Sequence, residues 1–249
     1  MNPEALSREA PPFLYSWDAG GGLLKIGQRP YNGKQFTKEE VPAVNEKFFA
    51  LPEEKQRAIL NAGYRVFANN SYKKSPMSEI ASEAGISKSL LFHYFHNKKE
   101  LYLYLWDACA KMTIRELKAS GCYGQSDLFD GLCLGMKAKV RLMRQYPYLG
   151  RFTVRAFYET DPEVHDELQK SIAQYGAFRA NARLLPLDPE RFVPGLDLKM
   201  MYLDMYWASE GYLWEKLQEG EPSVDEMEKD FMRLIDFWRS IYLRKETET

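Results

Sequence analysis

The chain has 249 residues, which at about 150 residues per domain corresponds to one or two domains with a core of their own. Hydrophobic residues make up 45% and charged residues 28%, a composition that excludes disordered and collagen-like chains. The 34 basic and 35 acidic residues give a net charge of -1. A generic polycation for nucleic acid is therefore excluded, and any basic surface must be local.

The three cysteines, Cys109, Cys122 and Cys133, are odd in number and lack CxxC spacing. This pattern argues against a disulfide framework and a zinc knuckle, and it favours a reducing cytoplasm. No signal peptide opens the sequence, and no run of about 18 apolar residues could cross a bilayer. We therefore expect a cytoplasmic protein that has no membrane span and no cofactor.

Glycine and proline interrupt residues 1–43 before any helical turn could be completed, so we expect a flexible N-terminal extension. Translation from an alternative codon at Val44 is one open explanation of this extension. From residue 51 onward the apolar residues follow a helical period, which predicts an all-α fold of about nine helices. We expect a small helical module at residues 44–100 and a larger helical domain at 101–249.

Residues 53–101 predict three short helices and the start of a fourth. Ser75 is the expected N-cap of the second helix, with Pro76 at the first helical position. Gly85 ends that helix in a left-handed conformation, and Ser87 caps a third helix from Lys88 to Phe95. Because the connection is short, it sets the two helices at a steep angle, which is the helix-turn-helix arrangement.

The third helix is predicted to bury one face and expose the other. At about 100° per residue, Leu91 and Phe95 share the face that seats the helix, whereas Ser89, Leu90 and His93 point the opposite way. The outward face is small and uncharged at its centre, which suits a DNA major groove about 12 Å wide. The flanking residues that could contact phosphate or the groove walls are Lys88, Phe92, Tyr94 and Lys98.

His93 and His96 are spaced as metal ligands could be, but no third ligand or HExxH pattern accompanies them. No cluster of nucleophile, base and orienting residue is evident either. We therefore expect neither a metal site nor a catalytic site.

These segments resemble the DNA-binding domain of the TetR family of bacterial transcriptional regulators. The resemblance lies in Ala58–Ala62, Phe67, Ser78–Ala81, Ala84–Lys88, Leu91–Phe95 and Asn97–Leu101, in order and without gaps. It implies a homodimer whose three N-terminal helices read an operator half-site, with an effector pocket and the dimer interface in a larger C-terminal domain.

The resemblance also assigns roles to individual positions. Four residues fall where the family contacts bases or the nearby backbone, namely Ser78, Lys88, Ser89 and Leu90. Phe92, Tyr94 and Lys98 fall at positions that usually face the DNA backbone. Phe92 stands where the family commonly has tyrosine, so a hydroxyl donor to phosphate is missing.

In the last two predicted helices, apolar residues recur at alternating steps of three and four, a pattern typical of a bundle seam. We expect these helices to form an antiparallel hairpin that joins its symmetry mate in a four-helix interface. The residues expected at the interface are Trp214, Leu217, Phe231, Leu234, Trp238 and Ile241.

Aromatic residues and methionines in the larger domain suit a mostly apolar cavity between helices. The residues expected to bind an effector are Trp106, Arg151, Arg155, Trp207 and Glu210. Two alternatives stay open, because the arginines could bind a carboxylate and Glu210 could bind a cation.

The function that follows is a repressor released from a pseudo-palindromic operator by a small, largely hydrophobic effector. The alternatives are a thiol redox sensor that uses Cys109 or Cys133 and a DNA-binding regulator without an effector.

Overall fold

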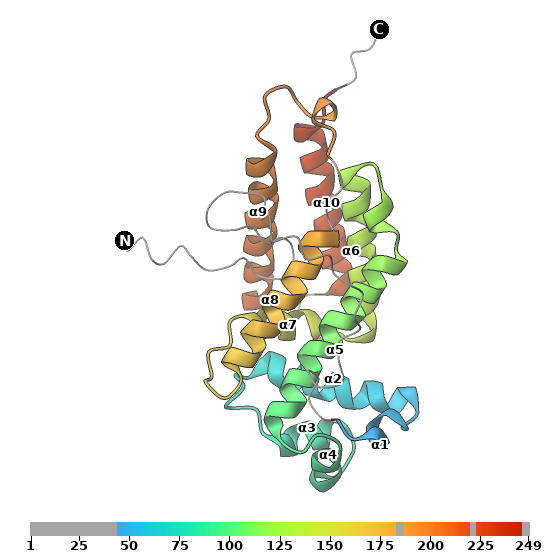
Figure 1. Cartoon of the computed structure of the whole chain (residues 1–249), viewed down its shortest axis with the longest axis vertical. Coiled ribbons are helices and arrows are strands. Elements are labelled where there is room, and N and C mark those ends of the chain that lie inside the picture. Colours follow the sequence, from blue (N-terminus) through green and yellow to red (C-terminus); the bar gives the residue numbers. More distant parts are fainter. Residues whose placement is uncertain (1–43, 183–186, 220–222, 246–249) are drawn as a thin grey trace, which may run out of the picture. The chain divides into compact units, whose positions relative to one another are not determined.

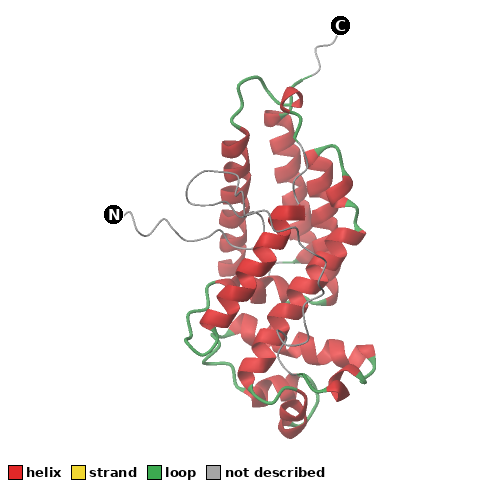
Figure 2. Ribbon diagram, viewed as in Figure 1, coloured by secondary structure: helices red, strands yellow, loops and turns green. Residues whose placement is uncertain are grey.

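The computed structural model describes residues 44–182, 187–219 and 223–245, without the side chains of residues 176–182, 210 and 217–219. Within these residues it contains ten α-helices and no β-strand (Figure 1, Figure 2), which confirms the all-α prediction. The helix beyond the predicted nine is α1 (Glu46–Phe49), a single turn. The predicted extension at residues 1–43 lies outside the described residues. None of the described helices combines the length and the apolar character that a membrane span requires.

The chain divides into two compact units. The first contains the described residues up to Lys111 and Tyr146–Phe178, and the second contains Met112–Gln145 and the described residues from Arg179 onward. The helices of the first unit are α1, α2 (Glu53–Asn69), α3 (Met77–Glu83), α4 (Lys88–Tyr94), the first part of α5 (Lys98–Ala119), α7 (Leu149–Phe157) and most of α8 (His165–Ala182). Those of the second are η2 (Cys122–Gly124), α6 (Leu128–Gln145), η3 (Pro189–Arg191), α9 (Leu198–Glu219) and α10 (Val224–Tyr242). The functional boundary at residue 100 stays a prediction.

An aromatic core holds the first unit together. Phe67 on α2, Tyr102 on α5 and Phe152 on α7 are buried, and the Tyr102 ring centroid lies 4.8 Å from Phe67 and 5.4 Å from Phe152. Helix α5 also crosses α2 closely, since a Cβ added to Gly63 would lie 2.6 Å from Leu105 Cδ1. Glycine at position 63 therefore permits the close approach of these two helices. Helix α2 in turn packs against α3.

In the second unit, ion pairs join both ends of α10 to α6. Arg144 near the end of α6 pairs with Asp225 at the start of α10 at 2.8 Å, and Arg239 near the end of α10 pairs with Asp130 in α6 at 2.7 Å. The two helices therefore run antiparallel and pack along their length. This packing places one face of α10 inside the unit.

Candidate nucleic-acid interface

The connection between α3 and α4 has the features of a helix-turn-helix. Gly85 has a left-handed φ of 66°, and Ser87 Oγ accepts a hydrogen bond from the Leu90 amide at 3.1 Å. Both features agree with the sequence analysis, since glycine tolerates positive φ and serine is a favoured N-cap. The Ile86 amide closes the turn by donating to the carbonyl of Ala81 at 3.0 Å.

The predicted start of α3 is wrong by one residue. The helix begins at Met77 with Pro76 at the N-cap position, and no side chain caps it. Ser75 is buried, and its hydroxyl donates to the Ser71 carbonyl at 2.9 Å. A serine hydroxyl can donate to a nearby carbonyl as readily as it can accept from a helix amide, and here Ser75 donates to a carbonyl of the preceding turn.

Helix α4 is seated as predicted, with Leu91 and Phe95 fully buried. Helix α1 supports the end of α4, a contact that was not predicted. Phe48 of α1 is buried with its ring centroid 4.9 Å from that of Phe95. Asn45 donates to the carbonyl oxygens of His93 and Tyr94, both at 3.1 Å. These bonds satisfy carbonyls that a seven-residue helix would otherwise leave unpaired. The signal that could have revealed α1 is Asn45 itself, a favoured N-cap residue.

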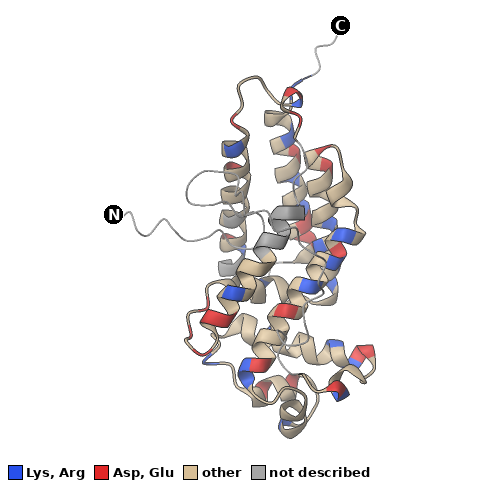
Figure 3. Cartoon of the chain, viewed as in Figure 1, with Lys and Arg blue, Asp and Glu red and all other residues tan. Residues whose placement is uncertain are grey.

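The outward face of α4 is open to solvent. Lys88, Ser89, Leu90 and His93 are exposed, and so is Ser78 on α3. Lys88 is the one lysine or arginine in α4, which is drawn mostly tan in Figure 3. The predicted orientation of Ser89, Leu90 and His93 is therefore confirmed, since all three point away from the core that holds Leu91.

Two flanking residues differ from the prediction. Tyr94 is 6% exposed and lies with its ring centroid 5.9 Å from Phe48, so most of its side chain is unavailable to a DNA backbone. The Lys98 ammonium donates to the carbonyls of Tyr72 at 3.0 Å and Lys73 at 3.4 Å, so it is already bonded within the protein. Phe92 is half-buried, with the Lys88 ammonium 5.8 Å from its ring centroid.

Comparisons with known proteins agree with this geometry. Residues 59–105 match the family model for bacterial regulatory proteins of the tetR family. The HTH-type transcriptional regulator RutR of Escherichia coli K12 is 24% identical over 149 residues, which cover 56% of this chain and 68% of RutR. These matches make the chain similar to regulators of the TetR family. Both matches are to transcriptional regulators and not to enzymes.

Solved structures of TetR-family regulators share the fold. One from Chloroflexus aurantiacus superimposes with a TM-score of 0.53 at 22% identity and covers 81% of this chain and 99% of its own. SmeT, the repressor of the Stenotrophomonas maltophilia multidrug efflux pump SmeDEF, superimposes with a TM-score of 0.52 at 17% identity, covering 80% and 93%. At these identities the likeness establishes the fold alone.

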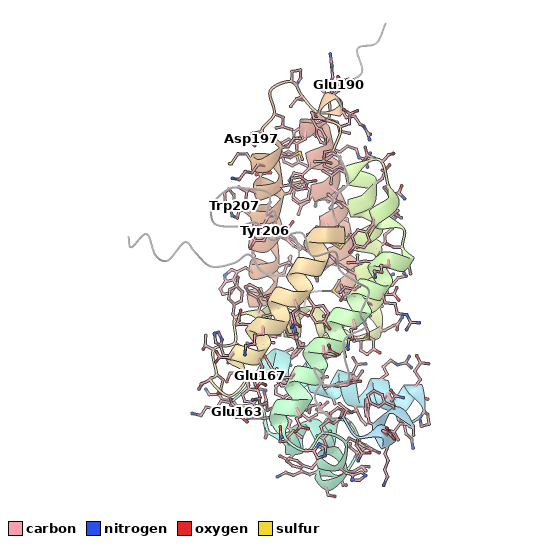
Figure 4. The ribbon with its side chains drawn as sticks, in the orientation of Figure 1. Glu163, Glu167, Glu190, Asp197, Tyr206 and Trp207 are labelled. Atoms are coloured by element: carbon pink, nitrogen blue, oxygen red, sulfur yellow. The ribbon has the colours of Figure 1, made fainter. Side chains whose placement is uncertain are left out.

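The residues predicted to bind an effector are divided between the two units. Trp106 is buried in the first unit, where its indole N–H donates to Ser171 Oγ at 3.0 Å. Arg151 is half-buried and Arg155 is exposed, and both also belong to the first unit. Trp207 belongs to the second unit and is 57% exposed (Figure 4), so its assignment to a cavity is wrong for the single chain. The side chain of Glu210 lies outside the described residues.

The predicted dimerisation residues also separate into two groups. Phe231 and Trp238 are 4% and 3% exposed, so their assignment to an interface is wrong. They are buried within their own unit, where the Phe231 ring centroid lies 5.0 Å from that of Tyr212 on α9. Trp214 at 59% and Ile241 at 41% are exposed. Leu234 is half-buried, and the side chain of Leu217 lies outside the described residues. Met200 and Phe237, which were not among the residues expected at the interface, are exposed as well.

Among the described side chains, no three His, Cys, Asp or Glu groups come together as metal ligands would. His96 Nδ1 instead lies 2.9 Å from Glu100 Oε2, one helical turn away.

Proposed function

We propose that this protein is a repressor of the TetR family that binds a pseudo-palindromic operator as a homodimer in the bacterial cytoplasm. It leaves the operator when a small, largely hydrophobic effector binds. The observation that supports the proposal is the exposed outward face of α4, while Leu91 and Phe95 bury the opposite side in the core. A short helix that is rigidly held and exposed on one side can enter a major groove.

The exposed side chains of α3 and α4 suit distinct DNA contacts. Ser89 and His93 carry groups that can hydrogen-bond to base edges, and Leu90 offers an apolar contact to a thymine methyl group. Lys88 at the start of α4 and Ser78 on α3 suit phosphate contacts that fix the register. Phe92 lacks the hydroxyl that a tyrosine would direct to phosphate.

The exposed apolar residues of α9 and α10 support a dimer. Met200, Trp207 and Trp214 recur every seven residues on α9 and are each at least 49% exposed, and α10 adds Phe237 and Ile241. The two helices run antiparallel, because Tyr212 donates to Asp230 at 3.0 Å and Tyr242 donates to Asp204 at 2.7 Å. Such apolar surface is unfavourable in water, and a two-fold partner that presents the same two helices would cover it.

An effector is supported by the fold and by the composition of the first unit. SmeT, which has a similar fold, forms a complex with triclosan, a small and largely apolar molecule. In this chain, α5, α7 and α8 supply buried aromatic residues such as Trp106 and Phe152. The dimer would have one arrangement that fits the operator and another that does not. An effector that binds the second arrangement more tightly lowers operator affinity, by an amount set by its difference in affinity for the two.

The thiol redox alternative receives less support. Cys109 and Cys122 are buried. Burial raises the pKa of the Cys133 thiol above its ordinary value, with nearby Arg239 acting in the opposite direction. A thiol with a raised pKa forms little of the thiolate that reacts with peroxide.

Selection of bound duplexes from random DNA by the purified full chain tests this proposal. We expect enrichment of a sequence with two inverted half-sites, and release of that sequence by one or more members of a library of small apolar compounds that begins with triclosan. Failure to enrich any sequence would contradict operator binding. An enriched operator that no compound releases, and that peroxide releases, would favour the thiol sensor instead.

A further inference from the structure

The turn between α2 and α3 is held at one residue, Tyr72, through both its backbone N–H and its backbone carbonyl. Its amide N–H donates to Glu159 Oε2 at 2.9 Å, and its carbonyl accepts from the Lys98 ammonium at 3.0 Å. The Tyr72 side chain is itself buried, with the ammonium 4.3 Å from its ring centroid. Lys98 is the first residue of α5, and Glu159 follows α7.

Glu159 has all of its carboxylate engaged. While Oε2 accepts from Tyr72, Oε1 accepts from the backbone amides of Thr160 and Asp161, both at 3.0 Å. The Glu159 carbonyl oxygen lies 2.9 Å from His165 Nδ1 at the start of α8. One residue therefore orders the α7–α8 loop and also binds the turn that precedes α3. Glu163 and Glu167, labelled in Figure 4, mark the loop and the first turn of α8.

The turn is short, so its position sets where α3 begins. Only four residues separate Tyr72 from Met77, the first residue of α3, and one of them is the buried Ser75. Helix α3 packs directly against α4. A shift of the Tyr72 backbone would therefore change how α3 and α4 are presented, even if the aromatic core of the unit stayed intact.

We propose that Glu159 and Lys98 are positioning residues for DNA binding, which clamp the backbone of Tyr72 and so make the orientation of the helix-turn-helix depend on the α7–α8 loop. The inference rests on the proposed reading of an operator by α4. It assigns Lys98 to the protein's own backbone rather than to a DNA phosphate. It also gives the α7–α8 loop a direct contact with the module that binds DNA.

The test compares Glu159→Ala and Lys98→Met with the natural full chain on the selected operator and on random duplex DNA, over a range of salt concentrations. Methionine keeps the aliphatic stem over the Tyr72 ring but removes the ammonium. Because bonds to charged groups are the stronger ones, we expect each change to weaken operator binding by roughly tenfold. Binding to random DNA and its salt dependence should stay unchanged, and the Tyr72 amide should exchange its hydrogen faster.

Asp166→Asn is the matched control, since this exposed carboxylate in the first turn of α8 carries the same charge near the same loop. It should behave as the natural protein does. Glu159→Gln keeps one oxygen for the three amides and should therefore lose less operator affinity than Glu159→Ala. This variant also provides the test if Glu159→Ala does not fold. A general loss of stability would not explain such a partial recovery of affinity.

Three results would overturn the inference. Unchanged operator affinity in both variants would show that the clamp does not position the helices. An equal loss on operator and random DNA in Lys98→Met, with a salt slope lower by about one, would mark Lys98 as a phosphate contact. An unchanged rate of hydrogen exchange at the Tyr72 amide in Glu159→Ala would show that Glu159 does not hold this amide. If the natural chain itself prefers no sequence, the proposed function fails, which is a distinct outcome.

Discussion

A Trp207→Glu, Trp214→Glu double variant is expected to be a monomer and to bind the operator roughly a hundredfold more weakly than the natural protein. Both tryptophans lie on the exposed face of α9, at 57% and 59% exposure. In a two-fold interface their indoles would be buried against a second copy, and carboxylates there would carry a large desolvation cost. Each half-site alone is read by one short helix, so loss of the dimer removes the gain from binding two half-sites together.

The oligomeric state is measured by sedimentation, and operator affinity by fluorescence anisotropy. Lys170→Glu in α8 changes the net charge by the same amount at an exposed position and should leave both quantities unchanged. Folding of the double variant should be close to normal, because neither tryptophan belongs to the core of its unit. A variant that remains dimeric would contradict the assignment of α9 to the interface.

Ser89→Glu is expected to lower operator affinity by roughly a hundredfold or more without lowering the melting temperature. The substituted side chain would place a carboxylate on the outward face of α4, where the negative DNA lies in the proposed complex, and like charges brought together at an interface cost several kcal/mol. Ser89 is exposed, and it lies in the first turn of α4, where an acidic residue interacts favourably with the helix dipole. Stability and DNA binding should therefore move independently.

Gln174→Glu in α8 is the control for charge, since its side chain is also exposed. It should reduce DNA binding little, and only through the long-range field that salt screens. Equal losses in the two variants, or a Ser89→Glu protein that binds normally, would contradict the outward face of α4 as the DNA-contacting surface.

Local signals in the sequence were sufficient to predict the helix-turn-helix. Gly85 and Ser87 define a turn and a cap by their own chemistry, and the spacing of Leu91 and Phe95 defines the buried face of α4. The cap of α3 was misplaced because Ser75 had two possible partners, a helix amide and the Ser71 carbonyl. The brace from Asn45 was missed because it joins residues 48 positions apart.

The α10 seam was predicted as apolar but assigned to the wrong neighbour. A stripe such as Phe231 and Trp238 shows that a helix face is buried, and periodicity alone cannot tell whether the chain's own helix or a second copy covers it. In the structure the neighbours belong to the same unit. Phe231 packs on Tyr212 of α9, and the ion pairs of Arg144 and Arg239 join α10 to α6. The exposed stripe through Trp207 and Trp214 was instead divided between a pocket and an interface.

Lys98 and Tyr94 illustrate the same limit at the DNA-binding module. Lys98 was assigned to DNA because it follows the third predicted helix, and Tyr94 because it flanks the outward face of that helix. In the folded chain Lys98 donates to the carbonyl of Tyr72, and Tyr94 packs against the ring of Phe48. Those partners lie 26 residues or more away in the sequence. Only the tertiary structure brings them together.

Methylation interference on the selected operator tests most directly whether α4 enters the major groove twice in each assembly. Guanine N7 lies in the major groove, so its methylation blocks a helix that reads base edges there. The proposed arrangement predicts two clusters of interfering guanines, related by the symmetry of the operator and about one helical turn, or a multiple of it, apart. A single cluster, or interference confined to adenine N3 in the minor groove, would contradict it.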